Sequence, residues 1–247
     1  MDTIFNHYIN GWKNKKDNQL KRCPNLKCKE GELLLTIPYG HSFLDVGAHY
    51  GDTIITMAML AKNNNRSDIR FIAFEPNEFK CNYIKTISYL NKLNITIFRA
   101  CIGDFSGRAI IDDYTRINKN DLLGNASFKK NRNGRLKIIT LDEIREKIEP
   151  IGFMHIDTEG WETLVLKGAS NILANPINKM ILVVECWSNF TAMCQIKRKR
   201  SPGITSQNPE KDIMEELNKY DTIKMGNIFE EENNIFFKIN YSDKNNK

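Results

Sequence analysis

The chain has 247 residues, of which 41% are hydrophobic and 27% charged, and its formal net charge is +6. This length suggests one main domain with a short appendage, and the composition is ordinary for an ordered globular protein. The longest purely apolar run, Met180 to Val184, is far too short to span a bilayer, and the start MDTIFNHYIN lacks a basic segment followed by an apolar one. We therefore expect a cytoplasmic protein without a membrane partner.

The cysteines and basic residues exclude little more. The six cysteines are scattered, which fits a reducing compartment. Cys23 and Cys28 have no second pair of ligands at zinc-site spacing, so we interpret them as ordinary thiols. The densest basic cluster is KRKR, Lys197 to Arg200, which is typical of a solvated loop but could also hold a phosphate-bearing acceptor.

The chain divides into an N-terminal extension, residues 1–40, and a domain over 41–247. The first part of the extension could be a helix, and the second part is interrupted by Pro24, Gly31, Pro38 and Gly40. It could cap a sheet or cover a substrate. From Phe43 onward, short apolar runs alternate with helical patterns, which predicts an α/β fold with a mostly parallel sheet between helices. Strands are predicted over 43–46, 70–74, 95–99, 153–156 and 180–185, and helices over 52–62, 77–93, 141–148 and 161–167.

Two further regions complete the predicted sheet. An insertion over roughly 103–140 contains GDFSGRAIIDDY and RLKIIT, which read as a turn and two extra strands that could form a ribbon at the rim. A helix over 209–219 and strands over 221–225 and 234–239 are expected to close the sheet with an antiparallel edge. The tail after Tyr241 is expected to be disordered.

The stretch FLDVGAHYGDT joins the first strand to the first helix. Ligands of open parallel sheets bind at the carboxyl ends of the strands, where Asp45 lies, and Gly47 and Gly51 let the backbone approach a ligand. The spacing differs from the G-x-G-x-x-G of dinucleotide sites, so a nicotinamide dehydrogenase is disfavoured. A ligand with a cationic amino-acid end suits the acid better. A purely structural role for the glycine turn stays open.

A second acid ends the second strand. Glu75, in AFEP, can accept hydrogen bonds from both hydroxyls of a ribose. Together, Asp45 and Glu75 suggest S-adenosylmethionine, with one carboxylate toward its ammonium and the other toward its ribose. The loop Ala100 to Ile102 would then flank the adenine.

Six segments in fixed order strengthen this interpretation: FLDVGAHYGD, AFEPNEF, ACIGDFSG, ITLDEI, FMHIDTEGWETLVLKGA and ILVVECW. With them, residues 41–187 resemble the FkbM-type S-adenosylmethionine-dependent methyltransferases. The resemblance implies a Rossmann-like class I methyltransferase fold and, most often, methylation of a hydroxyl, frequently on a sugar. His49, Thr158 and Trp161 depart from the usual pattern. The cofactor-binding candidates are Asp45, Gly47, His49, Gly51, Thr53, Glu75, Pro76, Cys101 and Asp157.

The catalytic candidates are Asp157, Glu159 and Glu185, at the ends of the fourth and fifth strands. A sugar hydroxyl is a poor nucleophile, so these carboxylates could act as a general base or could hold a divalent cation such as Mg²⁺. Alternatively, Glu159 caps a helix and Glu185 pairs with a basic residue. His155 is interpreted as a core histidine. Trp161 and Trp187 could stack on a sugar or simply pack in the core.

The predicted partner is a small-molecule or glycan acceptor, for example a nucleotide sugar or a glycosylated metabolite. Nucleic acid ranks second, because enzymes that methylate the RNA ribose 2′-hydroxyl usually place a lysine where Glu185 stands. A non-catalytic binding module is the remaining alternative. A homo-oligomer is compatible with the sequence, which leaves the oligomeric state open.

Overall fold

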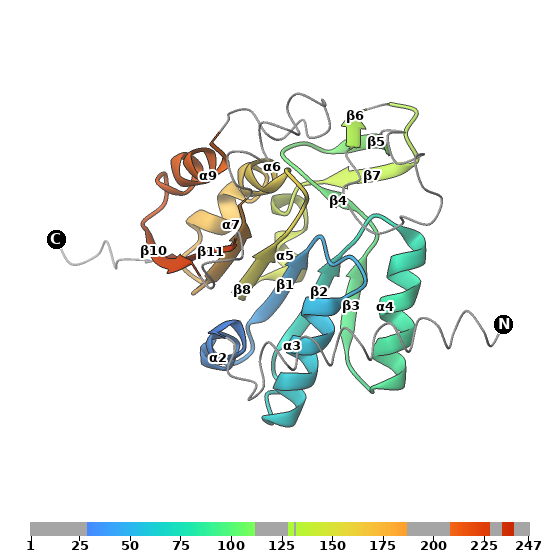
Figure 1. Cartoon of the computed structure of the whole chain (residues 1–247), viewed down its shortest axis with the longest axis vertical. Coiled ribbons are helices and arrows are strands. Elements are labelled where there is room, and N and C mark those ends of the chain that lie inside the picture. Colours follow the sequence, from blue (N-terminus) through green and yellow to red (C-terminus); the bar gives the residue numbers. More distant parts are fainter. Residues whose placement is uncertain (1–28, 112–127, 131, 187–207, 228–233, 240–247) are drawn as a thin grey trace.

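A seven-stranded sheet forms the centre of the molecule (Figure 1). The structure, a computed structural model, describes residues 29–111, 128–130, 132–186, 208–227 and 234–239. The strand order is β10-β11-β9-β8-β1-β2-β3. These strands are β1 (Ser42–Val46), β2 (Arg70–Phe74), β3 (Ile95–Phe98), β8 (Ile151–Ile156), β9 (Ile181–Glu185), β10 (Thr222–Asn227) and β11 (Asn234–Ile239).

The direction of the strands confirms the predicted mixed sheet. Within the described sheet, β11 is antiparallel to its neighbours β9 and β10, whereas every other neighbouring pair is parallel. β2 and β11 have the predicted bounds, and the other predicted strands end within one or two residues of the observed ones. The agreement has a simple cause: strands buried on both faces read as short apolar runs, and every residue of β1 and β8 is buried.

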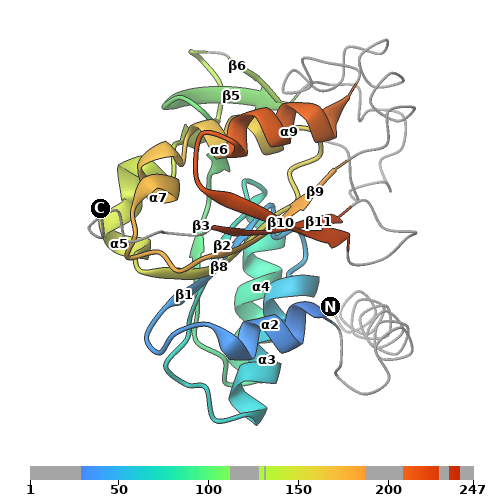
Figure 2. The ribbon, with the colours of Figure 1, turned by 90° about the vertical axis from the view of Figure 1, so that its left-hand side faces the viewer.

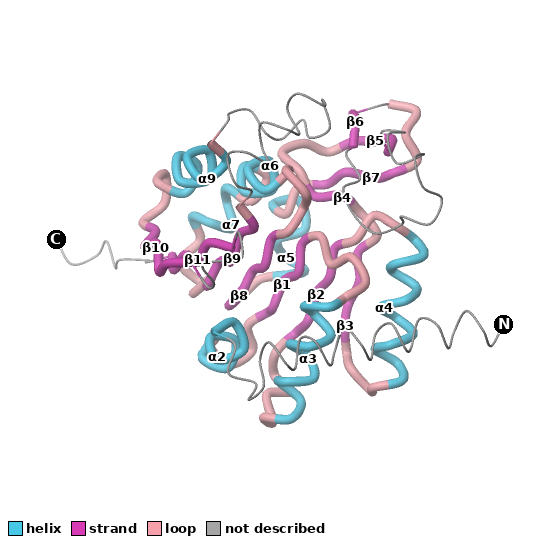
Figure 3. The backbone as a smooth tube through the Cα atoms, in the orientation of Figure 1, coloured by secondary structure: helices cyan, strands magenta, loops and turns pink. Residues whose placement is uncertain are grey.

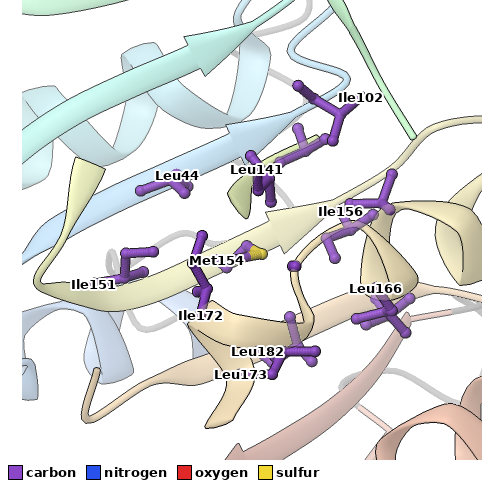
Figure 4. Packing of buried hydrophobic residues seen from close by; sticks show 14 of the residues in the cluster. Leu44, Ile102, Leu141, Ile151, Met154, Ile156, Leu166, Ile172, Leu173 and Leu182 are labelled. Atoms are coloured by element: carbon purple, nitrogen blue, oxygen red, sulfur yellow. The ribbon is translucent and has the colours of Figure 1, made fainter. Parts of the chain in front are cut away.

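Helices cover both faces of the sheet, as Figure 2 shows. Phe43 and Phe153 face the side of α2, α3 and α4, whereas Leu44 and Met154 face the side of α5, α6, α7 and α9 (Figure 4). None of the described helices is long and apolar enough to cross a bilayer. The helices are α2 (Lys29–Thr36), α3 (Asp52–Asn63), α4 (Glu78–Leu90), α5 (Arg145–Ile148), α6 (Glu162–Lys167), α7 (Ser170–Ala174) and α9 (Pro209–Leu217), with a short 3₁₀ helix over Asp142–Ile144.

The strand order places a topological switch point beside β1. After β1 the chain forms β2 and β3 on one side, and it then returns to form β8 and β9 on the other side. The loops that follow β1 and β8 therefore leave the same edge of the sheet in opposite directions (Figure 3). Ligands of open α/β sheets bind in the crevice at such a point.

A second, four-stranded sheet lies at the edge of the molecule where β1 and β8 end (Figure 1). Its order is β4-β7-β5-β6, with β4 (Cys101–Ile102), β5 (Gly107–Ile111), β6 (Phe128–Lys130) and β7 (Leu136–Ile139). The predicted insertion therefore forms a larger structure than a ribbon. Its inner face packs into a small core with Trp161, which lies just before α6.

Two helices were missing from the sequence prediction. α2 lies between Pro24 and Pro38, and its buried Leu34 packs in the same core as α3, so this part of the extension caps the sheet. The Arg66 guanidinium donates to the carbonyls of Leu35 and Ile37 at 2.7 and 3.0 Å and so satisfies the end of α2. α7 is held by Asp142, which accepts the backbone N–H groups of residues 171 and 172.

Several predictions concern residues outside the described ranges. They are the helix in the first part of the extension, the Cys23 and Cys28 thiols, Trp187, the Lys197 to Arg200 cluster and the tail after Tyr241. The domain boundary at residue 40 also stays a prediction.

Candidate functional site

The glycine turn after β1 is required by the backbone. Gly47 has a φ of +93°, and a Cβ built on it would lie 1.8 Å from the carbonyl oxygen of Asp157. Gly51 begins α3 with a φ of +82°, and a Cβ there would lie 2.8 Å from Ile55 Cδ1. Both conformations are ones that residues with a side chain rarely adopt. The turn therefore lets the loops after β1 and β8 approach each other at the switch point.

Asp45 is buried beneath this turn, with 1% of its surface exposed. Its Oδ2 accepts the backbone N–H of Ile54 in α3 at 3.1 Å, and its Oδ1 lies 3.0 Å from His155 Nδ1 on β8. Both carboxylate oxygens thus have partners inside the fold, which makes Asp45 a residue that positions the turn. Its predicted contact with a ligand ammonium stays a prediction.

His155 is the buried partner of Asp45. Burial disfavours the imidazolium, but the hydrogen bond and the negative charge of Asp45 outweigh it and raise the pKa of His155 to about 9. The pair is therefore an ion pair at neutral pH. The sequence interpretation of His155 as a satisfied core histidine is confirmed.

Glu75 joins the ends of β1 and β2. Its Oε2 accepts the backbone N–H of His49 at 2.9 Å, and its Oε1 accepts that of Asn77 at 2.8 Å. Burial raises the pKa of Glu75, against the opposing effect of the Lys80 charge and of these hydrogen bonds. His49 has a φ of +51°, so Glu75 stabilises a strained turn. Each carboxylate oxygen keeps a second lone pair, with which the side chain can accept a ribose hydroxyl.

The loop between β8 and α6 is organised in a similar way by Glu162, which the sequence analysis did not single out. Glu162 Oε1 accepts the backbone N–H groups of Thr158 and Gly160 at 2.8 and 3.1 Å and the Thr158 hydroxyl at 3.0 Å. Glu159 and Gly160 both have positive φ angles, of +55° and +95°. The sequence did contain a signal for this role: Glu162 is an acid in the first turn of a helix, shortly after Gly160, where it can accept backbone N–H groups.

Asp157 and Glu185 form a carboxyl pair at the ends of β8 and β9. The strands are parallel neighbours, and the two side chains share a hydrogen bond. Burial, followed by the negative charge of Asp157 and this hydrogen bond, raises the pKa of Glu185 well above its usual range. These effects favour a proton on Glu185. Asp157 is thus one partner of Glu185, and the alternative pairing with a basic residue stays a prediction.

Lys80, in the first turn of α4, is a second residue that the sequence analysis missed. Its Nζ lies 5.6 Å from the centroid of the Tyr50 ring, in the glycine turn. Burial lowers the pKa of Lys80, whereas the charges of Glu75 and Glu159 oppose this change. The ammonium thus lies within electrostatic range of both loops. Nothing in the local sequence pattern around Lys80 indicates this placement.

The remaining candidates lie around these groups. Cys101 is buried in β4, and burial together with the charge of Glu75 raises the pKa of its thiol to about 12. Thr53 and Pro76 are half-buried in the first turn of α3 and in the loop after β2. Trp161 is only 4% exposed and packs with Cys101 and Ile138, which favours core packing over stacking on a sugar.

Within the described ranges, no group of three or more His, Cys, Asp or Glu side chains is placed to hold a metal ion.

The structure therefore gathers most of the predicted site residues at one edge. Carboxylates at or just after the ends of β1, β2, β8 and β9 act on one another there. Glu185 experiences the charges of Asp157 and Glu159, and Glu75 experiences that of Asp45. Such an acidic crevice at a switch point suits a cationic nucleoside whose ribose hydroxyls need acceptors. The residues present fit S-adenosylmethionine: Glu75 has carboxylate oxygens that can accept ribose hydroxyls, and Gly47 and Gly51 carry no side chain that would keep a ligand from the backbone.

Comparisons with known proteins agree with this chemistry. The model of the methyltransferase FkbM domain family matches residues 45–219. No curated protein matches the chain significantly.

Three solved structures illustrate the structural similarity. A methyltransferase FkbM from Methylobacillus flagellatus is 14% identical over 80% of this chain, with a TM-score of 0.47, and the match spans only 43% of that protein's length. A putative rRNA methylase from Clostridium thermocellum is 11% identical, with 86% of this chain and 94% of that chain covered and a TM-score of 0.49. A SAM-dependent methyltransferase from Aquifex aeolicus is 12% identical, with coverages of 90% and 98% and a TM-score of 0.45. We base the family assignment on the family model alone.

Proposed function

Because the chain belongs to the methyltransferase FkbM family, we propose that it transfers the methyl group of S-adenosylmethionine to a hydroxyl of a sugar, carried by a glycan, a nucleotide sugar or a glycosylated metabolite. The observation that supports this proposal most is the Asp157–Glu185 pair at the carboxyl ends of β8 and β9, in which burial and the charge of Asp157 raise the pKa of Glu185. An alcohol oxygen must lose its proton when it forms an ether, and this pair offers a place for that proton.

The roles of the binding residues follow from their positions. Glu75 would accept the ribose hydroxyls, and the backbone of the glycine turn from Gly47 to Gly51 would hold the amino-acid end. When bound, S-adenosylmethionine supplies an electrophilic methyl carbon on a sulfonium whose departure gives a neutral thioether. Because the leaving group is already activated, the chain's main tasks are to align the acceptor and to exclude water.

Asp157 receives the acceptor's proton on a carboxylate oxygen. Glu185, whose pKa is raised, hydrogen-bonds to Asp157 and so supports this carboxyl group. A general base of this kind typically contributes a factor of about 10² to 10⁴ to the rate. The hydrogen bonds of Glu162 hold the backbone of the loop that follows Asp157. The position of the base therefore depends on the folding of this loop.

The test is an acceptor screen with methyl-labelled S-adenosylmethionine. The panel contains neutral oligosaccharides, phosphorylated or sulfated sugars, nucleotide sugars, glycosylated metabolites and single-stranded RNA. We expect label in a sugar ether. Label found only in RNA would instead support ribose 2′-O-methylation. Tight binding of S-adenosylhomocysteine without transfer to any acceptor would support a non-catalytic module.

A parallel screen with EDTA tests the cation. Activity that is lost in chelator and restored by Mg²⁺ would mean that a divalent ion gathers the acceptor hydroxyls at the carboxylates. If the rate in EDTA is unchanged, the reaction needs no divalent ion, and Asp157 removes the proton without one.

A further inference from the structure

The outer face of the second sheet carries a set of exposed basic side chains that the proposed function does not yet use. We call Arg108, Arg132, Arg135 and Lys137 the basic face; all four side chains are exposed. Arg108 on β5 and Lys137 on β7 lie directly opposite each other in an antiparallel pair, so both side chains leave the sheet on the same side. Arg135 immediately precedes β7, and Arg132 lies in the turn before it.

This arrangement is electrostatically unfavourable in the free protein. Like charges directly opposite each other on neighbouring strands destabilise a sheet. In the part of the chain that the structure describes, no carboxylate forms an ion pair with any of the four side chains. The sequence FKKNRNGRLK, residues 128–137, contains five basic residues and no acidic one. A bound anion would relieve this repulsion.

The backbone holds the basic face in a defined geometry. Arg108 Nη1 donates to the carbonyl of Gly134 at 3.3 Å, which ties β5 to the turn before β7. Gly134 lies so close to Ala109 that a Cβ on it would be 2.0 Å from the Ala109 carbonyl oxygen. Ala109 and Ile138 are fully buried on the opposite side of the sheet. The positive charges are therefore presented on a packed layer rather than on a loose loop.

That layer also packs against Trp161, which follows the loop between β8 and α6. Ile138, next to Lys137 in the chain, pairs with Cys101 on β4 and packs with Trp161. Gly103, just after β4, lies against Trp161, with its Cβ position 3.3 Å from the indole ring. Trp161 follows the loop that carries Asp157. The second sheet and the ends of β8 and β9 thus lie at the same edge of the molecule (Figure 1).

We propose that the basic face binds the negative groups of an anionic glycan, a sugar chain that bears phosphate, sulfate or carboxylate groups, while one of its hydroxyls is methylated at Asp157. This inference rests on the proposed function and narrows its acceptor. The charges are exposed and spread over β5, β7 and the segment just before β7, which suits a chain with repeated anionic groups better than a single buried phosphate.

The side chains of the face favour a glycan over single-stranded RNA. Proteins that bind single-stranded RNA combine basic residues with aromatic platforms on which bases stack. The basic face consists of arginine and lysine. Among the residues whose side-chain burial the structure describes, which leave out 110–131, the exposed aromatic side chains lie elsewhere: Tyr39 before β1, and Phe79 and Tyr89 in α4.

The test compares two double variants of the full chain that lose the same charge. Arg108→Gln/Lys137→Gln alters the basic face, and Lys85→Gln/Lys179→Gln removes two exposed lysines elsewhere. Binding of fluorescent dextran sulfate, neutral dextran and poly(U) RNA is measured over a range of salt concentrations. The basic-face variant should bind dextran sulfate about tenfold more weakly, with a log–log salt slope smaller by about 2, whereas the control should stay close to the wild type.

Three outcomes would overturn the proposal. Equal losses in both variants would mean that only net charge matters. Unchanged binding by the basic-face variant would place the polyanion elsewhere, and tighter binding of poly(U) than of dextran sulfate would make nucleic acid the occupant. Calorimetry with S-adenosylhomocysteine on all three proteins reports separately on the proposed function: all should bind it equally, and absence of binding to the wild type would refute that function alone.

Discussion

Asp45 on β1 and His155 on β8 form a buried ion pair at the centre of the sheet, with Oδ1 and Nδ1 3.0 Å apart. The two residues are direct neighbours in the register of the parallel strands. Through its other oxygen, Asp45 also accepts the N–H of Ile54 at the start of α3. This pair therefore links the two strands that border the switch point and the helix that follows the glycine turn.

The ion pair predicts that stability falls in mildly alkaline solution. The pKa of His155 is raised from 6.5 to about 9 by Asp45, so its stabilisation is fully present below about pH 6.5 and is lost as the pH rises through about 9. The shift corresponds to a change on the order of 3 kcal/mol. Urea unfolding at pH 6 to 10 should show this decline in the wild type and a flatter profile in His155→Gln. His41→Gln is the control, and the same slope in His155→Gln as in the wild type would contradict the assignment.

Gly47 should be far less tolerant of substitution than another glycine with a positive φ. Gly47→Ala adds a methyl group 1.8 Å from the Asp157 carbonyl oxygen, whereas Gly40→Ala, at a φ of +76°, meets no atom within 4 Å. Backbone strain alone costs on the order of 1 kcal/mol at either site. We therefore expect the free energy of unfolding, measured by chemical denaturation, to fall by about that much in Gly40→Ala and by several times more in Gly47→Ala. Equal losses would show that the two loops can separate without cost.

Glu162 should matter as an acceptor of hydrogen bonds rather than as a charge. Glu162→Gln keeps an amide oxygen that can accept the N–H groups of Thr158 and Gly160, whereas Glu162→Ala leaves these donors without it. Removing such a buried acceptor costs about 1 to 3 kcal/mol. We expect the alanine variant to lose that stability and most methyl transfer, and the glutamine variant to keep more of both. Equal effects of the two substitutions would point to the charge instead.

Lys80 should tune the preference between sulfonium and thioether ligands. Its ammonium lies in range of Glu75 and Glu159 at the acidic crevice. Lys80→Met keeps a long side chain and removes the positive charge, so affinity for S-adenosylmethionine should rise about fivefold relative to S-adenosylhomocysteine, which lacks the sulfonium charge. Calorimetry with both ligands gives this ratio. Lys85→Met, on the exposed side of α4, should leave it unchanged; a falling ratio in Lys80→Met would mean that Lys80 supports sulfonium binding instead.

Substitutions of Asp157 and Glu185 should lower the rate of methyl transfer while leaving the affinity for the cofactor product nearly unchanged. Asp157→Asn removes the proton acceptor and should lower kcat by at least about 10², with S-adenosylhomocysteine affinity within a few-fold of the wild type. Glu185→Gln retains a hydrogen-bond donor toward Asp157 and should be milder. Asp221→Asn, an exposed acid before β10, is the matched control. Full activity of Asp157→Asn would remove this carboxylate from proton transfer.

Much of the fold and the framework of the site could be predicted from local sequence patterns. A strand buried on both faces needs a short apolar run, as Phe71 to Phe74 in β2 show. A tight turn that starts a helix needs residues able to adopt positive φ, as Gly47 and Gly51 do. Because parallel strands end at a common edge, the acids at strand ends were expected to gather there. These properties depend on neighbours in the chain.

Only the tertiary structure decided what each acid contacts. Asp45 and His155 are 110 positions apart, and the sequence could not show that Asp45 turns toward this imidazole. Glu185 meets Asp157 because two strands are adjacent, and Arg108 meets Lys137 because two others are antiparallel. The physical reason is the same in each case: protonation, pairing and repulsion depend on distances between side chains and on burial, and folding brings those groups together from distant parts of the chain.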